Sequence, residues 1–288
     1  MTHEITFASI DELSSLIRGG ELSPVEVTDA AFERIQETEP KLNAFLELFE
    51  EGARSAAREA EAEITAGRYR GPLHGVPVGL KDLVDVAGSP TTGGSPLFQQ
   101  NVARTDATIT SRFRQAGAII IGKTNLVMHA MGATGLNPYT GHPHNPWDLE
   151  RCTGGSSSGS GAAIAAGCLV GAIGTDTGGS IRMPASMCGI TGLKPTYGRV
   201  SRAGVLDLSW SCDHVGPMAR RVSDCAYMMN ALAGYDPRDP ASADEPVVDY
   251  TLGLDRGPED LRIGVPSDYF FAENVDPEID SAVRAAST

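Results

Sequence analysis

The stretch from Cys152 to Ala185 constrains this chain more than any other. It holds two clusters of glycine and serine around an apolar segment of helix length, and no charged residue occurs from Cys152 to Thr175. Asp176, Ser180 and Arg182 then follow within seven positions. Glycine permits backbone conformations that other residues avoid, and serine supplies small hydroxyl groups. The pattern predicts backbone that approaches another group closely, as in an active site.

The rest of the chain predicts an α/β protein. The first 70 residues carry helical patterns, and from Gly71 short apolar runs separated by glycine and proline alternate with further helical patterns. A helical periodicity begins at Ser9, and the capping signal of Ser23–Glu26 marks the start of a second helix. We expect helices over 9–17, 23–36, 51–66, 106–115, 162–166, 223–232 and from 276, and strands over 76–81, 118–121, 169–173 and 261–265.

These patterns suggest three regions. Residues 1–70 form a helical N-terminal layer and residues 71–234 a core. Residues 235–288 form a linker, rich in aspartate and proline, and the start of a C-terminal region. Because the last helical pattern runs into the final residue without a closing cap, we expect a chain that lacks its C-terminal part.

Charge and cysteine usage narrow the function classes. The net charge of −14 disfavours direct binding to nucleic acid or anionic lipid. Five widely spaced cysteines without a CxxC pair encode neither a disulfide framework nor a zinc site, which fits a cytoplasmic protein without a metal. We find no export signal and no apolar run long enough to span a membrane.

Two motif matches do not predict the chemistry of their patterns. Residues 117–124 satisfy the P-loop pattern G-x-x-x-x-G-K-[ST], but three consecutive isoleucines predict a buried strand there. Residues 155–159 fit the nucleophile elbow G-x-S-x-G, yet the polar NPWDLERCT before them offers no strand that enters the turn. None of the six histidines stands in a recognisable metal or triad context. A serine nucleophile would therefore need another base.

Lys81 is the candidate for that base, because it ends the apolar run VPVGLK. Desolvation of a lysine at the end of a buried strand favours the neutral amine, which can accept a proton. The alternative is a structural lysine paired with Asp82 or Asp85, and the spacing alone leaves both interpretations open.

Several blocks of the chain together resemble the amidase signature family of serine amidohydrolases. They are GPLHGVPVGLKD, DATITSRFRQAGAIIIGKTN, NPWDLERCTGGSSSGSGAAIAAG, GTDTGGSIRMPA and GLKPTYGRVSRAG, and the similarity runs from about Ser9 to Asp239. The resemblance implies a mixed, mostly parallel β-sheet covered by helices. It also implies an amidase that needs no cofactor and hydrolyses a carboxamide to a carboxylate and ammonia or an amine.

The resemblance assigns a triad of Lys81 as base, Ser156 as the serine after a cis peptide bond, and Ser180 as the nucleophile that forms an acyl-enzyme. The peptide N–H groups of Thr177, Gly178, Gly179 and Ser180 would form the oxyanion hole. Gly155 would relieve the steric problem of the cis bond, and Asp176 and Arg182 would form a buried pair that supports the loop. Ser157 and Met131 are weaker candidates for substrate contacts.

Two other interpretations stay open. The blocks are also similar to the glutaminase component of tRNA-dependent amidotransferases, which would need partner subunits. Alternatively, the chain is an inactive fragment of the amidase fold that acts only as a binding module. Because an open site would hydrate Lys81 again and raise its pKa, we expect low activity from this chain alone. The identity of the amide and the oligomeric state, including a homodimer, are not encoded in any pattern.

Overall fold

The computed structural model describes residues 2–257, 262, 264–266 and 275–286, in two compact units. The first unit spans Met1–Leu252, so the divisions expected at residues 70 and 234 lie inside it. The second unit, Gly253–Thr288, contains the helix α9 (Pro277–Ala285), which begins where the sequence predicts it, at the N-cap Asp276. The strand expected over 261–265 lies partly outside the described residues, and its described positions form no strand.

Four helices open the first unit, and local capping fixes the starts of two of them. The four are α1 (Thr2–Phe7), α2 (Ile10–Gly19), α3 (Pro24–Leu42) and α4 (Glu50–Thr65). Ser9 and Ser23 each form a capping box with a glutamate three residues later, which confirms both predicted starts. The helix α3 runs beyond the expected end at residue 36, because it ends only at Asn43, which has left-handed backbone geometry.

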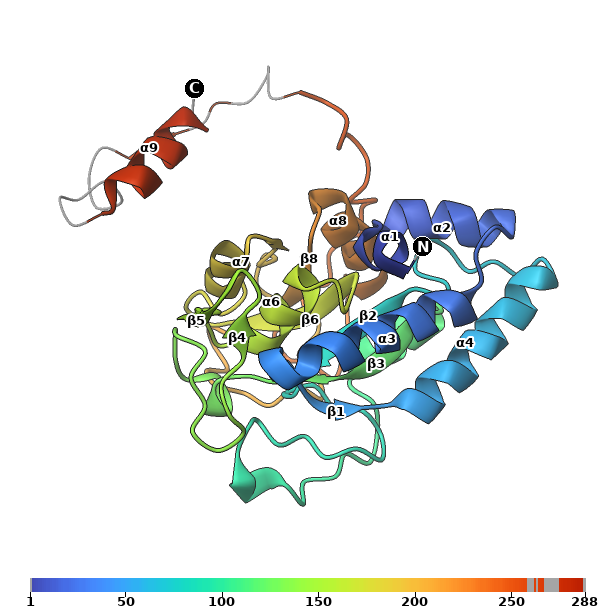
Figure 1. Cartoon of the computed structure of the whole chain (residues 1–288), viewed down its shortest axis with the longest axis horizontal. Helices are drawn as coiled ribbons and strands as arrows, with labels where there is room; N and C mark the ends of the chain where they lie inside the picture. Colours follow the sequence, from blue (N-terminus) through green and yellow to red (C-terminus); the bar gives the residue numbers. More distant parts are fainter. Residues whose placement is uncertain (1, 258–261, 263, 267–274, 287–288) are drawn as a thin grey trace. The chain divides into compact units, whose positions relative to one another are not determined.

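In the described part of the chain, the central sheet has six strands in the order β1-β3-β2-β6-β8-β7 (Figure 1). Their bounds are β1 (Phe45–Leu48), β2 (Pro77–Lys81), β3 (Ile119–Thr124), β6 (Gly171–Asp176), β7 (Thr191–Gly192) and β8 (His214–Ala219). Three of them, β2, β3 and β6, correspond to predicted strands. The strand β3 includes Gly122–Thr124 of the P-loop match, so the rejection of a phosphate loop there is confirmed.

The mixed α/β sheet is confirmed, but its parallel part is smaller than expected. Among the described strands, β3, β2 and β6 are mutually parallel, whereas β1, β8 and β7 join by antiparallel pairings. A crossover through a helix makes a parallel pair, and the segment between β6 and β8 instead reverses the chain. In the ladder between β2 and β3, a bulge near Val78 sets a register in which Leu80 faces Lys123 and Lys81 faces Thr124.

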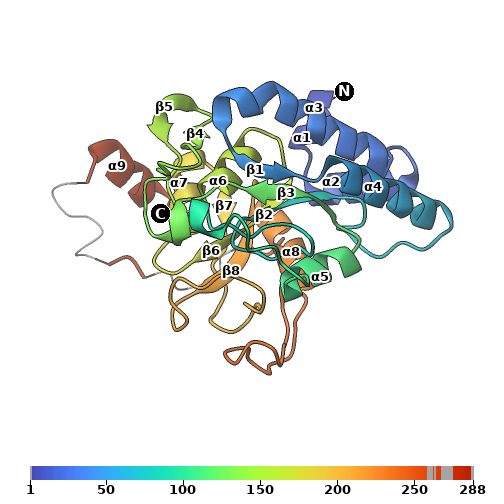
Figure 2. The ribbon, with the colours of Figure 1, turned by 90° about the horizontal axis from the view of Figure 1, so that it is seen from below.

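Helices cover both faces of the sheet and bury two apolar clusters. One cluster joins α2, α5 (Thr108–Gln115) and α8 (Val222–Leu232) to one face of the sheet. The other joins α3, α4, α6 (Ser158–Ala165) and α7 (Arg182–Cys188) to the opposite face. Figure 2 shows α3 and α4 on one side of β1, β3 and β2, and α5 and α8 on the other. The first unit is therefore a three-layer α/β/α structure.

The shorter elements lie around this sandwich. The strands β4 (His144–Asn145) and β5 (Asp148–Cys152) form a separate hairpin, and the 3-10 turns η1 (Pro96–Phe98) and η2 (Met128–Ala130) lie in loops. The expectation that no strand precedes residues 155–159 was wrong, because β5 ends at Cys152. However, β5 is exposed and, among the described strands, pairs with β4 alone, whereas a nucleophile elbow follows a strand of the main sheet. Among the helices of the described part of the chain, none is long and apolar enough to cross a membrane.

Candidate active site

The Lys81 side chain lies in a cage of three hydroxyl groups at the carboxyl end of β2. Its Nζ atom lies 2.7 Å from Ser156 Oγ, 3.0 Å from Ser157 Oγ and 2.8 Å from Thr175 Oγ1. Lys81 is 0% exposed. In the described part of the chain no carboxylate forms an ion pair with it, since Asp82 pairs with Lys123 and Asp85 accepts a bond from a threonine. The geometry therefore does not support the structural pairing of Lys81.

This environment favours the neutral amine. Burial lowers the pKa of Lys81 from 10.5 to about 7, and the more distant carboxylates of Asp176 and Asp213 offset only part of that effect. The sequence suggested that an incomplete site would hydrate this lysine. That expectation was wrong for the described chain, because the hydroxyl cage and the strands close around Nζ without any further segment.

The number of hydrogen-bond donors in the cage limits which hydroxyl group can donate to a neutral Lys81. An ammonium group can donate to all three hydroxyl oxygens, whereas a neutral amine has one lone pair that must accept from one hydroxyl. Ser157 Oγ donates to the Thr175 carbonyl oxygen, and it accepts from the Thr175 N–H. Its proton is therefore engaged, so the hydroxyl that donates to a neutral Lys81 belongs to Ser156 or Thr175.

Ser156 and Ser157 stand at the entry to α6, and the Gly155–Ser156 peptide bond is cis. The start of α6 packs directly on the neighbouring backbone. A Cβ atom at Gly159 would lie 2.3 Å from the Ala44 carbonyl oxygen, so only glycine fits there. Glycine at this position lets α6 approach the sheet, which brings Ser156 to the end of β2.

Ser180 follows β6 on a tight turn that the Asp176 carboxylate organises. Asp176 accepts the N–H groups of Gly179 (2.8 Å) and Ile181 (3.1 Å), and Arg182 contacts it through Nε (3.0 Å) and Nη2 (2.9 Å). Burial alone would raise the pKa of Asp176, but the bonds from Arg182 and the two backbone groups outweigh it and hold the pKa below its usual value. The Asp176–Arg182 pair differs from the expected buried pair, since the Arg182 side chain is 54% exposed.

A backbone contact joins the two glycine–serine clusters, but among the described residues no hydrogen bond joins the hydroxyls of Ser156 and Ser180. The Ser157 N–H donates to the Ser180 carbonyl oxygen at 3.2 Å, which ties the two glycine–serine clusters together. Ser180 is almost fully buried. Within the residues that the structure describes, no side chain forms a hydrogen bond with Ser180 Oγ.

The four candidate oxyanion donors are not equivalent. The Gly179 N–H donates to the Asp176 carboxylate, so it is engaged already in this structure, and its role as an oxyanion donor stays a prediction. Gly179 has φ of 130°, which favours glycine, and this conformation turns its N–H toward Asp176. The Thr177 hydroxyl donates to Asp213, whose carboxylate also accepts two N–H groups from the turn at residues 208–209. The N–H groups of Thr177, Gly178 and Ser180 remain as candidates.

The two candidate substrate contacts are placed differently. Ser157 is fully buried with its hydroxyl engaged, which makes it part of the lysine cage instead of a surface for substrate. Met131 is 74% exposed, next to the turn η2. In the part of the chain that the structure describes, no cluster of three or more histidine, cysteine, aspartate or glutamate residues could hold a metal ion.

Sequence reasoning missed Thr175, Asp213 and a second buried lysine. Lys123 Nζ lies 2.8 Å from Asp82 Oδ1 and donates to the Pro90 carbonyl oxygen at 3.0 Å, which anchors the loop that follows β2. A signal for Thr175 existed, because β2 and β6 are adjacent parallel strands and side chains at their carboxyl ends meet. Nothing in the spacing links Asp82 to Lys123.

Comparison with known proteins shows to which family this chain belongs. Residues 26–288 match the model of the protein family described as Amidase. The chain belongs to this family, as the resemblance predicts.

Two curated relatives are each 48% identical to the chain. One, from Roseiflexus sp. (strain RS-1), is named as the A component of glutamyl-tRNA(Gln) amidotransferase, and the match covers 99% of this chain and 58% of the relative. The other is named amidase, from Pseudomonas putida, and its match covers 98% of this chain and 59% of the relative. The chain thus spans a little under three fifths of the length of these relatives.

A solved structure shows the same fold with a TM-score of 0.94 at 38% identity. The match covers 97% of this chain and 61% of the other, which is described as a vestigial protein complex that reveals the origins of an s-triazine catabolic enzyme. A peptide amidase from Stenotrophomonas maltophilia has the same fold with a TM-score of 0.81 at 42% identity, over 85% of this chain and 52% of its own. The α/β architecture is therefore that of known amidase relatives.

Proposed function

We propose that this protein is a serine amidohydrolase that hydrolyses a small carboxamide through an acyl-enzyme on Ser180. The observation that carries this proposal is the cage around Lys81, where Nζ lies 2.7 Å from Ser156 Oγ and burial lowers the pKa to about 7. A lysine with this pKa is half neutral near pH 7, which suits a general base. A lysine with a purely structural role would be expected to face a carboxylate.

The proposed reaction begins with two coupled proton transfers. Neutral Lys81 accepts the Ser156 proton while Ser156 accepts the Ser180 proton, and Ser180 Oγ forms a bond with the amide carbonyl carbon. The carbon–nitrogen bond then breaks, the proton returns through Ser156 to the leaving nitrogen, and ammonia or an amine departs. Water next hydrolyses the ester by the same proton path. The hydroxyls of Ser156 and Ser180 must approach one another when substrate binds, as catalytic hydrogen bonds commonly tighten in the complex.

The turn before Ser180 would stabilise the tetrahedral intermediate. We assign the oxyanion hole to the N–H groups of Thr177, Gly178 and Ser180, and give Gly179 the separate role of fixing the turn to Asp176. Ser157 and Thr175 would hold Lys81 in place, and Met131 stays a candidate for substrate contact. No metal or cofactor enters this mechanism.

A second candidate function is that of the glutaminase component of a tRNA-dependent amidotransferase, because the Roseiflexus relative carries the name of such a component and is as similar to this chain as the relative named amidase. In that case glutamine would be the amide, and partner subunits would receive the ammonia. The two functions share the chemistry at Ser180 and differ in substrate and partners. We also propose a cytoplasmic location, on the ground that all five cysteines are free thiols.

A covalent probe tests the shared chemistry. We expect an alkyl fluorophosphonate to label the chain, Ser180→Ala and Lys81→Ala to abolish labelling, and Ser186→Ala, at an exposed serine of α7, to retain it. Hydrolysis of aliphatic amides, aromatic amides and glutamine then separates the two functions. An unlabelled wild-type chain would instead support a binding module without turnover.

A further inference from the structure

A large groove lies away from the candidate active site, on the edge of the sheet beside α4. Its volume is about 860 Å³, and it is lined by β1, β3, α4, the segment 86–89 and the end of α5. Ile119 and Ile120 in its floor pair with Pro77 and Val78, at the amino end of β2. The triad candidates stand at the carboxyl end of β2, so the groove is separate from them.

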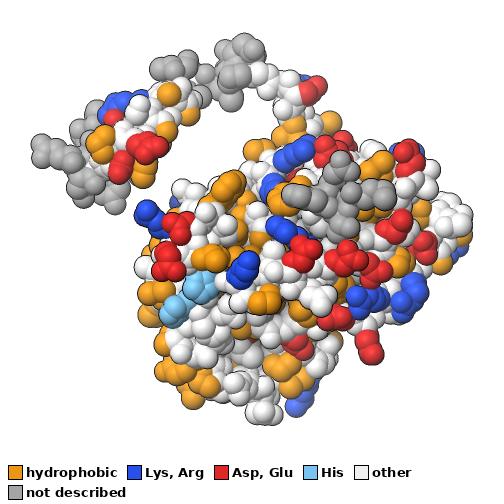
Figure 3. Space-filling model, in the orientation of Figure 1, with side chains coloured by type: hydrophobic (Ala, Val, Ile, Leu, Met, Phe, Trp, Pro, Cys, Tyr) orange, Lys and Arg blue, Asp and Glu red, His pale blue; other side chains and the backbone are white. Residues whose placement is uncertain are grey.

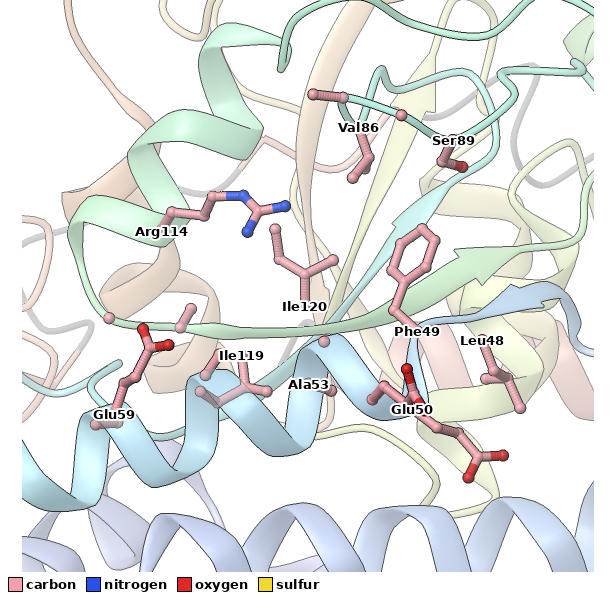
Figure 4. Close-up of a pocket in the computed structure, with 18 of the residues that line it drawn as sticks. Leu48, Phe49, Glu50, Ala53, Glu59, Val86, Ser89, Arg114, Ile119 and Ile120 are labelled. Atoms are coloured by element: carbon pink, nitrogen blue, oxygen red, sulfur yellow. The ribbon is translucent and has the colours of Figure 1, made fainter.

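The groove exists because β1 is short. β1 pairs with β3 only as far as Gly122, and the backbone then turns into α4, held by the Phe49 N–H on the Ile121 carbonyl oxygen. Beyond that point β3 has no strand beside it on this edge in the described chain. Figure 4 shows β3 crossing the groove, with Ile119 toward α4 and Ile120 and Phe49 on the side of Val86. The floor is therefore apolar and follows the direction of a strand.

The rim of the groove is acidic. Its lining contains five glutamates, which are Glu47, Glu50, Glu51, Glu59 and Glu63. The two lining arginines are already paired, one with Glu63 and the other with Asp106. Burial lowers the pKa of His74, which favours its neutral form. Figure 4 places Glu59 and Glu50 near opposite ends of the groove, and Figure 3 shows acidic side chains gathered, with some basic ones, over α3 and α4.

Glu51 and Glu59 are the exposed glutamates of the lining whose carboxylates are not held in an ion pair with any residue that the structure describes. An occupant of the groove would bury apolar side chains against the floor and meet these carboxylates at the rim. A second copy of this chain fits poorly, because its own net charge is −14.

We propose that this groove binds a segment of a partner protein in which apolar residues are combined with lysine or arginine. The apolar side chains contact Phe49 and Ala56, which are partly exposed beside the buried Ile119 and Ile120, and the basic side chains pair with Glu51 and Glu59. Because the floor follows the unpaired edge of β3, an extended segment matches its shape. The partner would engage the protein without blocking the entrance to Ser180.

A peptide probe tests the proposal on the full 288-residue chain. The probe is a fluorescein-labelled octapeptide in which leucine alternates with lysine, and its control alternates leucine with glutamate. We expect fluorescence anisotropy to show saturable binding of the basic peptide that weakens as salt is added, and no binding of the acidic peptide. Failure of the basic peptide to bind, or equal binding of both peptides, overturns the proposal.

Two pairs of variants locate the binding. Ala56→Trp fills the groove, whereas Ala62→Trp adds the same side chain at a position of α4 outside the lining, so only the first should weaken binding, by about tenfold or more. The charge reversals Glu51→Lys and Glu59→Lys combined should also weaken it, while Asp148→Lys with Glu150→Lys, on the exposed β5, should not.

Circular dichroism establishes that each variant is folded, and the charge pair keeps the test valid if Ala56→Trp unfolds. Equal affinities within both pairs would refute the assignment. Dimerisation that is lost in the groove variants would assign the groove to a second copy and overturn the partner proposal. The measurement needs no substrate, so its failure leaves the proposed amidase function untouched.

Discussion

Replacing Lys81 by methionine should stabilise the protein in a manner that depends on pH. The wild-type chain must bury an amine whose pKa falls from 10.5 to about 7 on folding. The ammonium form is thus disfavoured in the folded state by about 5 kcal/mol. Methionine has a similar length and no charge, so it removes this cost, although it leaves the hydroxyls of the cage without their shared partner.

The sign follows from proton binding. Between about pH 7 and 10.5 the unfolded chain holds a proton on Lys81 that the folded chain has lost, so the free energy of unfolding of the wild type rises with pH in this window. Below pH 7 both states are protonated and the full cost of burial applies. From about pH 6 to pH 9 the wild type should therefore gain about 2.7 kcal/mol relative to Lys81→Met.

Urea denaturation of the two proteins at several pH values measures this difference. The control is Lys41→Met, which removes an exposed lysine in place of a buried one and is measured at the same pH values. If the stability difference between wild type and Lys81→Met is the same at pH 6 and pH 9, then Lys81 does not titrate near neutrality and the reasoning about the base is wrong.

Three further predictions concern the pH dependence of activity, the Lys123–Asp82 ion pair and the cap of α2. The kcat/KM for an amide substrate should rise with pH through about 7, since only neutral Lys81 accepts a proton, and a flat profile across neutrality would exclude it as the base. Lys123→Met should lower the free energy of unfolding by about 3–5 kcal/mol because it leaves the Asp82 carboxylate buried and unpaired. Adding Asp82→Asn should restore part of that loss in urea denaturation, and no recovery would contradict the pairing. Ser9→Ala should cost about 1 kcal/mol by removing the cap of α2, while an unchanged midpoint would show that the cap contributes nothing.

Local features of the fold were predictable from the sequence. The caps at Ser9 and Ser23 depend on residues three positions away, and the isoleucine run of β3 signals its own burial. Strand β8 was not expected, because Gly216 and Pro217 favour a turn in isolation. Its antiparallel pairing with β6 depends on tertiary contacts that no local pattern carries.

In the candidate site, too, the sequence predicted which residues are involved but not the contacts that depend on the tertiary structure. The family resemblance placed Lys81, Ser156 and Ser180 by position, and the structure brings Lys81 and Ser156 within hydrogen-bond distance. The hydrogen bond of the Gly179 N–H depends on the orientation of the Asp176 carboxylate. The ion pair of Asp82 depends on Lys123, a lysine in another strand. Spacing determines which residues are near in the chain, but not how their hydrogen bonds are distributed.

The bulge between β2 and β3 determines which lysine faces the serines. Lys81 and Lys123 stand one register step apart on adjacent strands, and their side chains leave opposite faces of the sheet. A slip of β3 by one residue in this ladder would turn its side chains to the other face. Lys123 would then be directed toward the hydroxyl cage, beside Lys81, and Asp82 would lose its partner. Faithful strand alignment during folding is thus a condition for keeping a single amine among the serines.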